Sequence, residues 1–386
     1  MRGAAPPGAL MGVLSLPSRR RAPLMNVRYQ DELRLFPSPL AKFGIALVAV
    51  AFFAGPYVLS DFWLNVLNYA AVFAVGAIGL NLLTGYTGQV SLGHSVFMGV
   101  GAYVAVQFGV KNTWPLLLYL PTAAVVGALV GAVVGPFALR LRGDYLVIVT
   151  LGLVFLGEYI FDQWESVTGG NGGTSTAAPL KIWHFDFASL TVFGKLFTRD
   201  AGIFWLFWAI VLLAALLAKN LVRSRPGRAM QAVRDRDLAA EVIGVSLFRY
   251  KVGAFAISSA FAAVAGAMYG SLQQYVSPSE LSGAAGLFLS IQFVAIIILG
   301  GLGTIFGGII GAIVLQAMPK LINRYSDKIP FVTAAGGGND GIISAASLNN
   351  IIYGLLIVAF LVFESRGLAA VWLRVKAYFK TWPFSY

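Results

Sequence analysis

The side chains best suited to binding a solute lie in one polar break between two apolar stretches. Residues 85–94 read GYTGQVSLGH, in which Thr87, Gln89 and Ser91 offer hydroxyl and amide groups that donate or accept hydrogen bonds. Ser91 and Ser95 flank the expected start of the next helix, where backbone N–H groups could hold a carboxylate. The break is therefore either a binding site inside a membrane or a plain turn at its surface.

A second glycine-rich break, GGLGTIFGGIIGA at residues 300–312, joins two apolar stretches in the other half of the chain. Paired interruptions of this kind are typical of a transport site near the middle of the membrane, built from half-helix ends. Close packing of small residues is the alternative, and His94 could equally be a buried structural donor. The predicted solute pathway comprises Gly85, Thr87, Gly88, Gln89, Ser91, His94, Gly301, Gly303, Thr304 and Gly307.

Composition indicates that membrane-spanning helices position these residues. Of the 386 residues, 58% are hydrophobic and only 11% are charged, against roughly 25% charged in a soluble domain. The apolar runs have the length that a helix needs to cross about 30 Å of hydrocarbon. We predict an all-α integral membrane protein, a polytopic helical bundle of about ten transmembrane helices with broken or re-entrant glycine-rich segments. The expected spans are residues 43–60, 63–84, 91–109, 115–139, 144–163, 202–219, 251–275, 285–300, 303–318 and 348–364.

The net charge of +12 is explained by topology. Basic residues gather in the N-terminal tail, at Arg140 and Arg142, and in residues 219–251, and cytoplasmic loops retain such clusters. Ten crossings that start inside place all three clusters and the C-terminus inside, and nucleic acid is not an expected partner. One group of basic residues is an exception, because Lys320, Arg324 and Lys328 fall outside in this topology.

The chain divides into a membrane domain and two tails. Residues 1–42 are Pro- and Arg-rich without helical periodicity, which predicts a disordered basic tail. Residues 43–368 form the transmembrane domain, with a cytoplasmic loop at 220–250 and an outer loop at 164–201, and residues 369–386 form a cytoplasmic tail.

The most polar stretch after the N-terminal tail is RPGRAMQAVRDRDLAAEVIGVSLFRYK, residues 225–251. Its apolar residues recur at spacings of three and four, which predicts short amphipathic helices along the inner face. Such helices either lie at the lipid headgroups or dock into a groove on a soluble partner.

Several kinds of chemistry are excluded by residue type. The chain has no cysteine, and its two histidines are far apart, so neither a thiolate nor a metal centre is expected. No G-x-x-x-x-G-K-[S/T] loop occurs, because Gly194 and Lys195 are followed by Leu196. If ATP supplies the energy, a partner must hydrolyse it, and no cofactor is expected in this chain.

Five motifs in order carry a family resemblance: GYTGQVSLGHSVFMGVGAYVAV, LRGDYLVIVTLGL, TGGNGG, GRAMQAVRDRDLAAEVIGVSLFRYK and ILGGLGTIFGGIIGA. Over roughly residues 60–368 the chain resembles the LivM-type permease of branched-chain amino acid ABC transporters. The resemblance implies alternating-access import of Leu, Ile or Val across a bacterial inner (plasma) membrane. It also implies a LivH-like second permease, two ABC ATPase subunits that bind ATP, and an extracytoplasmic substrate-binding protein.

The same resemblance assigns roles to two loops. Ala239, Ala240 and Gly244 match the family's coupling signature, whereas Leu238 stands where the broader importer pattern has Glu. The residues expected to couple to the ATPases are Arg228, Arg234, Asp235, Ala239, Ala240 and Gly244. The TGGNGG segment at 168–173 is either a flexible linker or a contact for the binding protein through Gly169, Gly170 and Asn171.

Two other functions stay open. Urea or short-chain amide importers use similar permeases, and composition does not separate the substrates. An ion-coupled secondary carrier would need carboxylates within a span, and Glu158 and Asp162 lie four residues apart on one helix face. Both carboxylates fall near the outer end of their span, where anchoring at the interface is the alternative.

Overall fold

The structure, a computed structural model, describes residues 49–50, 52–138, 145–182, 185–187, 189, 191–192, 195–325, 332–333, 343–363, 367–372 and 374. The chain forms two units, residues 1–52 and 53–386, and every element below belongs to the second. The predicted tail 1–42, residues 43–48 and 51 of the predicted span 43–60, Arg140, Arg142, Lys328 and most of the predicted tail 369–386 lie outside the described residues.

Helices make up most of the described chain. They are α3 (Asp61–Thr87), α4 (His94–Val104), η1 (a π-helix, Ala105–Lys111), α5 (Leu116–Ala138), α6 (Tyr145–Gln163), α7 (Glu165–Thr168), η2 (a 3-10 turn, Gly170–Gly172), α8 (Arg199–Arg223), α9 (Arg225–Asp235), α10 (Asp237–Val242), α11 (Leu247–Gln273), α12 (Pro278–Leu281), α13 (Gly283–Gly300), α14 (Ile305–Tyr325) and α15 (Ala345–Phe363).

Seven described segments are long and apolar enough to cross a membrane: α3, α5, α6, α8, α11, α12 with α13, and α14. The predicted all-α membrane class is therefore confirmed, while the count of about ten spans and the inside position of both termini stay predictions. One predicted span differs in form. Residues 91–109 were expected as a single crossing, but α4 begins at His94 and becomes a π-helix at Ala105.

The described residues also form four pairs of two-residue strands. Three are antiparallel: β1 (Thr174–Ser175) with β6 (Tyr275–Val276), β2 (Lys181–Ile182) with β3 (Phe185–Asp186), and β4 (Thr191–Val192) with β5 (Lys195–Leu196). The fourth pairs β7 (Val332–Thr333) with β8 (Ile343–Ser344) in parallel. The predicted outer loop 164–201 thus contains regular local structure, although these strands are too short to form a core.

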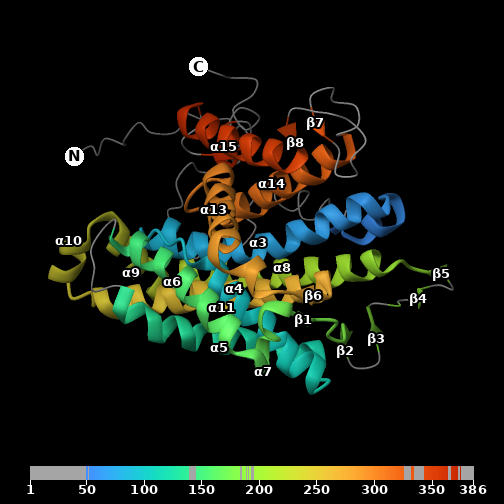
Figure 1. Ribbon diagram of the computed structural model, residues 1–386. Coiled ribbons are helices and arrows are strands. Elements are labelled where there is room, and N and C mark those ends of the chain that lie inside the picture. Colours follow the sequence, from blue (N-terminus) through green and yellow to red (C-terminus); the bar gives the residue numbers. More distant parts are fainter. Residues whose placement is uncertain are drawn as a thin grey trace, which may run out of the picture. The chain divides into compact units, whose positions relative to one another are not determined.

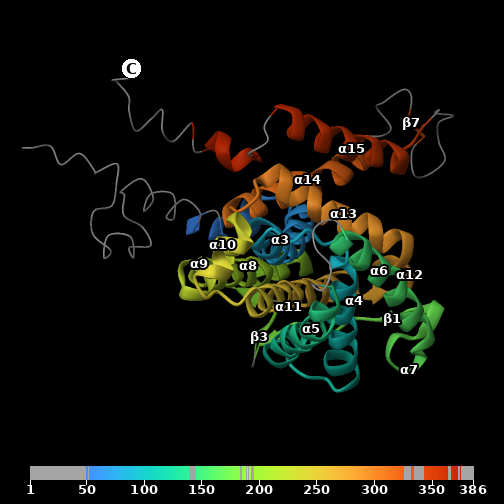
Figure 2. The same ribbon diagram turned by 90° about the vertical axis from the view of Figure 1, so that its left-hand side faces the viewer.

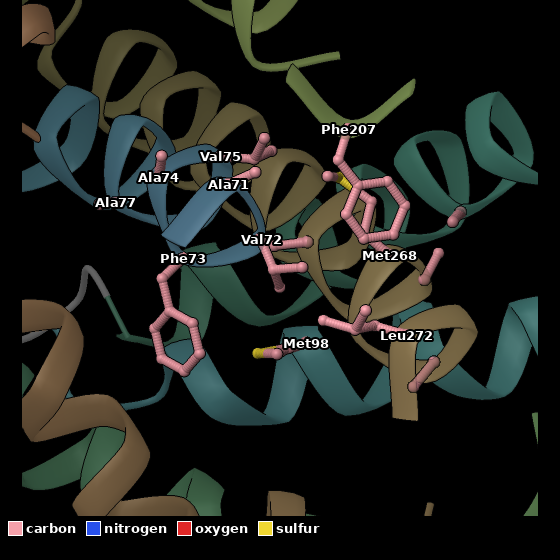
Figure 3. Close-up of a cluster of buried hydrophobic side chains, with 14 of the residues drawn as sticks. Ala71, Val72, Phe73, Ala74, Val75, Ala77, Met98, Phe207, Met268 and Leu272 are labelled. Atoms are coloured by element: carbon pink, nitrogen blue, oxygen red, sulfur yellow. The ribbon is translucent and has the colours of Figure 1, made fainter. Parts of the chain in front are cut away.

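Helix α3 is the centre of the core. It is apolar on all sides, and a helix of that kind is buried all round. Phe207 of α8, Met98 of α4 and Met268 of α11 converge on it, as Figure 3 shows. Figures 1 and 2 show α8 and α11 running along α3, with α4 inclined steeply to it.

Glycine lets α4 and α11 touch through their backbones. A Cβ added at Gly101 of α4 would lie 1.8 Å from the carbonyl oxygen of Ala263 in α11. A Cβ added at Gly266 of α11 would lie 1.7 Å from the carbonyl oxygen of Met98. Small residues permit such close crossings between membrane helices.

The long helices have two distinct ends. Arg199, the first residue of α8, donates through Nη2 to the Ser271 carbonyl near the end of α11, at 2.7 Å. Helix α8 finishes at Arg223, one residue before α9 begins. We call these the Arg199 end and the α9 end, and Figure 1 shows α9 and α10 opposite the β4–β5 hairpin.

Two basic residues that the predicted topology places outside, against the tendency of basic residues to lie in cytoplasmic loops, contact aromatic rings at the Arg199 end. Lys320 Nζ lies 4.3 Å from the centroid of the Tyr69 ring. The Arg324 guanidinium carbon lies 4.4 Å from the centroid of the Phe62 ring. Cation–π contacts stabilise a positive charge locally, so these residues have a packing role in addition to any effect on topology.

Candidate functional site

The first break begins inside a helix. Helix α3 continues through Gly85 to Thr87 and ends where Gly88 adopts a left-handed conformation, with φ of 72°. The Gly88 N–H donates to the Thr84 carbonyl at 3.1 Å, and the Gln89 N–H donates to the Leu83 carbonyl at 3.2 Å. Only residues 88–93 are non-helical, so the break is shorter than the sequence predicts.

This non-helical segment returns along the inside of the bundle. His94, the first residue of α4, donates through Nε2 to the Gly76 carbonyl at 2.9 Å. Gly76 precedes Gly85 by nine residues, or about 14 Å along the α3 axis. On the way, the Leu92 N–H donates to Thr150 Oγ1 at 3.0 Å and the Gly93 N–H to Ser91 Oγ at 3.3 Å. Protein groups therefore satisfy the freed backbone, as a broken helix in a membrane requires.

His94 has a structural role in this arrangement. A carbonyl oxygen can only accept, so Nε2 carries a proton and the ring donates to Gly76. The ring also packs edge-on against Phe293, with centroids 4.9 Å apart. These contacts favour the buried-donor alternative, while direct contact with solute stays a prediction.

The remaining polar groups of the first break are buried together. Thr87 Oγ1 donates to the Leu83 carbonyl, and Gln89 Nε2 donates to Thr87 Oγ1 at 3.2 Å. Gln89 Oε1 has no hydrogen-bond partner among the described residues. Ser91 is buried as well. Gln89 thus retains an acceptor that a passing solute could use.

The second break is a tight turn between two packed helices. Gly301 and Gly303 have φ of 116° and 75°, a region that favours glycine. Thr304 Oγ1 donates to the Gly301 carbonyl at 2.7 Å and closes the turn. A Cβ added at Gly307 would lie 2.3 Å from the Gly300 carbonyl oxygen, so α13 and α14 meet at glycine. Close packing therefore accounts for Gly307, and turn geometry for Gly301 and Gly303.

Asn81 joins the two breaks, and sequence reasoning missed it. Its Oδ1 accepts from the Gly303 N–H at 2.8 Å, and its Nδ2 donates to the Thr304 carbonyl at 2.8 Å. A Cβ added at Gly85 would lie 2.1 Å from Asn81 Oδ1 and 2.4 Å from the Gly303 nitrogen. The available signal was a lone amide in the apolar run AIGLNLL, since a buried amide requires partners.

Arg234 of α9 reaches the same place from the polar loop. Its Nη1 donates to the Gly85 carbonyl at 2.7 Å, while Nη2 contacts Asp235 Oδ1 at 2.9 Å. A Cβ added at Gly303 would lie 3.4 Å from Nη1. A cation is favourable at a helix C-terminus, where carbonyls lack intrahelical partners. Arg234 therefore ties α9 to both breaks.

The two breaks meet at one end of the long helices. Arg234 of α9 contacts Gly85, and Asn81 contacts the 301–304 turn, so both breaks lie at the α9 end. A solute site near the middle of the membrane stays a prediction. Only the start of α4 lies beside the middle of α3.

Of the polar loop that is predicted to couple to the ATPases, one part packs against the bundle and another part is exposed on the surface. Met230 and Val233 of α9 are buried against the bundle, and Arg228 donates through Nη1 to the Arg223 carbonyl at 2.8 Å. In α10, Ala240 is buried and Ala239 is exposed. Gly244, with φ of 88°, follows the end of that helix.

Helix α10 and the residue after it have exposed apolar side chains on the protein surface. The exposed fractions of Leu238, Val242 and Ile243 are 68%, 88% and 75%. Leu238 and Val242 lie one turn apart on the helix, so their side chains share a face. This surface is at the α9 end, next to the part of the loop that Arg234 ties to the bundle.

The TGGNGG segment forms an ordered turn at the Arg199 end. The Gly170 N–H donates to Thr168 Oγ1 at 3.1 Å, and the Tyr275 hydroxyl donates to the Gly172 carbonyl. Three of its glycines have positive φ, and strand β1 directly after it pairs with β6. These contacts favour a defined turn over the flexible-linker alternative. Asn171 is exposed, and its contact with a binding protein stays a prediction.

Within the described residues, no three His, Cys, Asp or Glu side chains gather in a way that could hold a metal ion. The polar groups at the first break are hydroxyls, amides and one imidazole, which suit hydrogen bonding to a solute.

Comparison with known proteins identifies relatives. A family model described as branched-chain amino acid transport system / permease component matches residues 62–361. The high-affinity branched-chain amino acid transport system permease protein LivM of Salmonella typhimurium is 31% identical over 301 residues, which cover 74% of this chain and 69% of that protein.

More distant relatives are other permeases. LivH of Escherichia coli (strain K12), from the same kind of system, is 24% identical over 275 residues, or 68% of this chain and 85% of LivH. The fructose import permease protein FrcC of Rhizobium meliloti is 26% identical over 289 residues, or 72% and 75% of the two chains. No solved structure matches the chain.

Proposed function

We propose that this chain, which belongs to the family of permease components of branched-chain amino acid transport systems, forms one transmembrane half of an ATP-driven importer for Leu, Ile and Val. As a permease component it is a transport subunit and not an enzyme. It is a multi-pass protein of a bacterial inner membrane.

The partners follow from the proposal. A LivH-like permease supplies the other transmembrane half, in line with the names of the two relatives, LivM and LivH. Two ATPase subunits bind and hydrolyse ATP, because this sequence has no phosphate-binding loop. An extracytoplasmic binding protein delivers the amino acid, and the exposed turn around Asn171 is our candidate for its contact.

The observation that supports the mechanism most strongly is the contact between Arg234 and the Gly85 carbonyl. Helix α10 offers Leu238 and Val242 to a groove on an ATPase, as amphipathic helices do in groove recognition. Movement of α10 displaces α9, and Arg234 then transmits the displacement to the end of α3. Asn81 extends the connection to the α13–α14 turn.

Alternating access follows if the re-entrant segment 88–93 responds to that displacement. Its Gln89 acceptor and the start of α4 lie beside α3, and a shift at Gly85 changes how they are enclosed. A hydrophobic amino acid needs an apolar site with few polar groups, and the described surroundings of the first break have that character.

The proposal is tested by reconstituting the chain with its second permease, ATPases and binding protein in proteoliposomes. We expect ATP-dependent uptake of radiolabelled leucine, isoleucine and valine, and little uptake of urea or fructose. Uptake of urea or fructose alone would overturn the substrate assignment. Uptake of leucine by the chain alone under an ion gradient, without ATPases, would instead establish the secondary-carrier alternative.

A further inference from the structure

We infer that Ser95, Ser290 and Glu158 form a binding site for the carboxylate and ammonium groups of an amino acid, at the buried start of α4. The inference rests on the proposed import of amino acids; it introduces Ser290 and gives Glu158 a role other than ion coupling. Three features support the site: the helix end, the unpaired hydroxyl and the carboxylate.

The start of α4 is an electropositive helix end inside the protein. The helix runs from His94 to Val104 and continues as a π-helix to Lys111. The hydrogen bond from His94 to the Gly76 carbonyl fixes this end beside the middle of α3. Backbone N–H groups and the helix dipole both favour an anion at such a position.

The Ser95 hydroxyl is buried there without a partner. Its side chain is 0% exposed, and Oγ has no hydrogen-bond partner among the described residues. The Ser95 N–H donates to Ser290 Oγ at 3.2 Å, so the Ser290 hydroxyl proton is available for a second acceptor. An unpaired buried hydroxyl is costly, and a ligand carboxylate that accepts from both hydroxyls would remove that cost.

The Glu158 carboxylate approaches the same helix, α13, that carries Ser290. A Cβ added at Gly283, the first residue of α13, would lie 2.3 and 2.4 Å from its two oxygens. A Cβ added at Gly286 would lie 3.1 Å from Ser95 Oγ. Gly283 and Gly286 are separated by about 4.5 Å along the helix axis. One turn of α13 therefore has a hydroxyl donor beside one glycine and a carboxylate beside the other.

Glu158 has no cationic partner among the described residues. A carboxylate inside a membrane span is normally paired or functional, because a lone charge is expensive there. A ligand ammonium would supply the missing cation. Phe161 and Leu281 pack around Gly99, one turn after Ser95 on α4, and give the surroundings an apolar character suited to a branched aliphatic side chain.

The pairing of donors with an acceptor selects the ligand class. An α-amino acid carries a carboxylate and an ammonium on one carbon, which matches hydroxyls and a helix end on one side and Glu158 on the other. Urea lacks both charges, and a free anion would use only half of the site. The side chains are packed in this conformation, so binding requires α6 or α13 to move away from α4, as alternating access provides.

The test measures binding of tritiated leucine to the assembled complex in nanodiscs, without the binding protein. We expect Ser95→Ala and Ser290→Ala to weaken binding about tenfold, and Glu158→Gln to weaken it by about ten- to a hundredfold. Ser258→Ala on α11 is the matched control, because Ser258 Oγ is also buried without a described partner, while the Ser258 backbone carbonyl lies against α3 at Gly79. Asp162→Asn, one turn from Glu158, is the control for charge.

Two analogues separate a binding role from a structural one. Leucine amide lacks the carboxylate, and 4-methylpentanoate lacks the ammonium. We expect Glu158→Gln to lose the preference for leucine over 4-methylpentanoate, and Ser95→Ala to lose part of the preference for leucine over leucine amide. ATP hydrolysis by each complex verifies that the variant has assembled.

Wild-type affinity in both Ser95→Ala and Glu158→Gln would overturn the inference, and so would an equal loss in Ser258→Ala. If Ser95→Ala does not assemble, the Glu158→Gln variant still tests the site, because Glu158 is partly exposed and its preference between leucine and the two analogues can be measured. Leucine uptake separates the two levels of argument. Failure of the wild-type complex to import any amino acid would refute the proposed function, whereas normal import by all three variants would refute only this site.

Discussion

The first and second glycine-rich breaks share glycine and threonine between apolar helices, yet the chain leaves them in different directions. After Gly88 it turns back along α3 as a non-helical segment, whereas after Gly300 it makes a four-residue turn and continues as α14. Gln89 Oε1 in the first break and Ser95 Oγ directly after it have no described partners, while the second break uses Asn81 and Thr304 to close its hydrogen bonds. Similar composition therefore supports a re-entrant segment in one half and a rigid hairpin in the other.

The largest effect is expected where the two breaks touch. Gly85→Ala places a Cβ 2.4 Å from the backbone nitrogen of Gly303, which cannot move without opening the α13–α14 turn. We expect a loss of about 3 kcal/mol in the free energy of unfolding and almost complete loss of leucine uptake, measured by thermal unfolding and transport of the complex.

Gly88→Ala is the matched control. The nearest atom to its Cβ is Arg234 Cγ at 3.1 Å, with the Arg234 backbone 3.6 Å away, and its φ of 72° costs about 1–2 kcal/mol for alanine. An equal or larger loss at Gly88 than at Gly85 would contradict the view that the contact between the breaks dominates.

A smaller effect is expected when the turn is detached from α3. Asn81→Ala removes the partners of the Gly303 N–H and the Thr304 carbonyl, and we expect about 2 kcal/mol less stability of the complex. Thermal unfolding measures the change. An unchanged melting temperature would mean that the second break is held mainly by the Gly300–Gly307 contact.

Arg234→Met tests the connection of the first break to α9. Methionine keeps much of the length of the side chain but removes the hydrogen bond to the Gly85 carbonyl. We expect uptake to fall about tenfold, because the loss of one hydrogen bond to a charged group weakens the connection between α9 and the end of α3. ATP hydrolysis should continue, because it takes place on the partner subunits.

Arg225→Met, which removes a charge from the exposed start of the same helix, should leave that ratio of uptake to hydrolysis near the wild-type value. Equal uncoupling by both variants would show that the charge of α9 matters more than the contact.

The smallest effects distinguish solute contact from closure of a turn. Gln89→Ala is expected to lower uptake about threefold at a small cost in stability, because Oε1 has no described partner and the Nε2 bond that is lost, to Thr87 Oγ1 at 3.2 Å, is long. Thr304→Ala is expected to cost about 1 kcal/mol of stability, since it removes the bond to the Gly301 carbonyl. The reverse pattern would assign solute contact to the second break.

Sequence patterns predicted the membrane class and most span positions, because hydrophobic length sets both. They also predicted a break at residues 85–94, of which the structure leaves 88–93 non-helical, and short helices in the polar loop, where α9 and α10 form. They did not predict Asn81, whose role depends on a partner more than 200 residues away, or the order of the TGGNGG turn, which depends on Tyr275. Glycine has both packing and conformational uses, and neighbouring residues alone do not distinguish them.

The crossing of α4 with α11 determines how the bundle can open. At Gly101 and Gly266 main chain rests on main chain, with no side-chain layer that could slide or compress. We therefore expect α4 and α11 to move together, as one rigid unit. The opposite face of α4 meets α6 through side chains such as Val96 against Gly157, which can separate by changing rotamers. We expect the gap that admits a solute to form there, between α4 and α6.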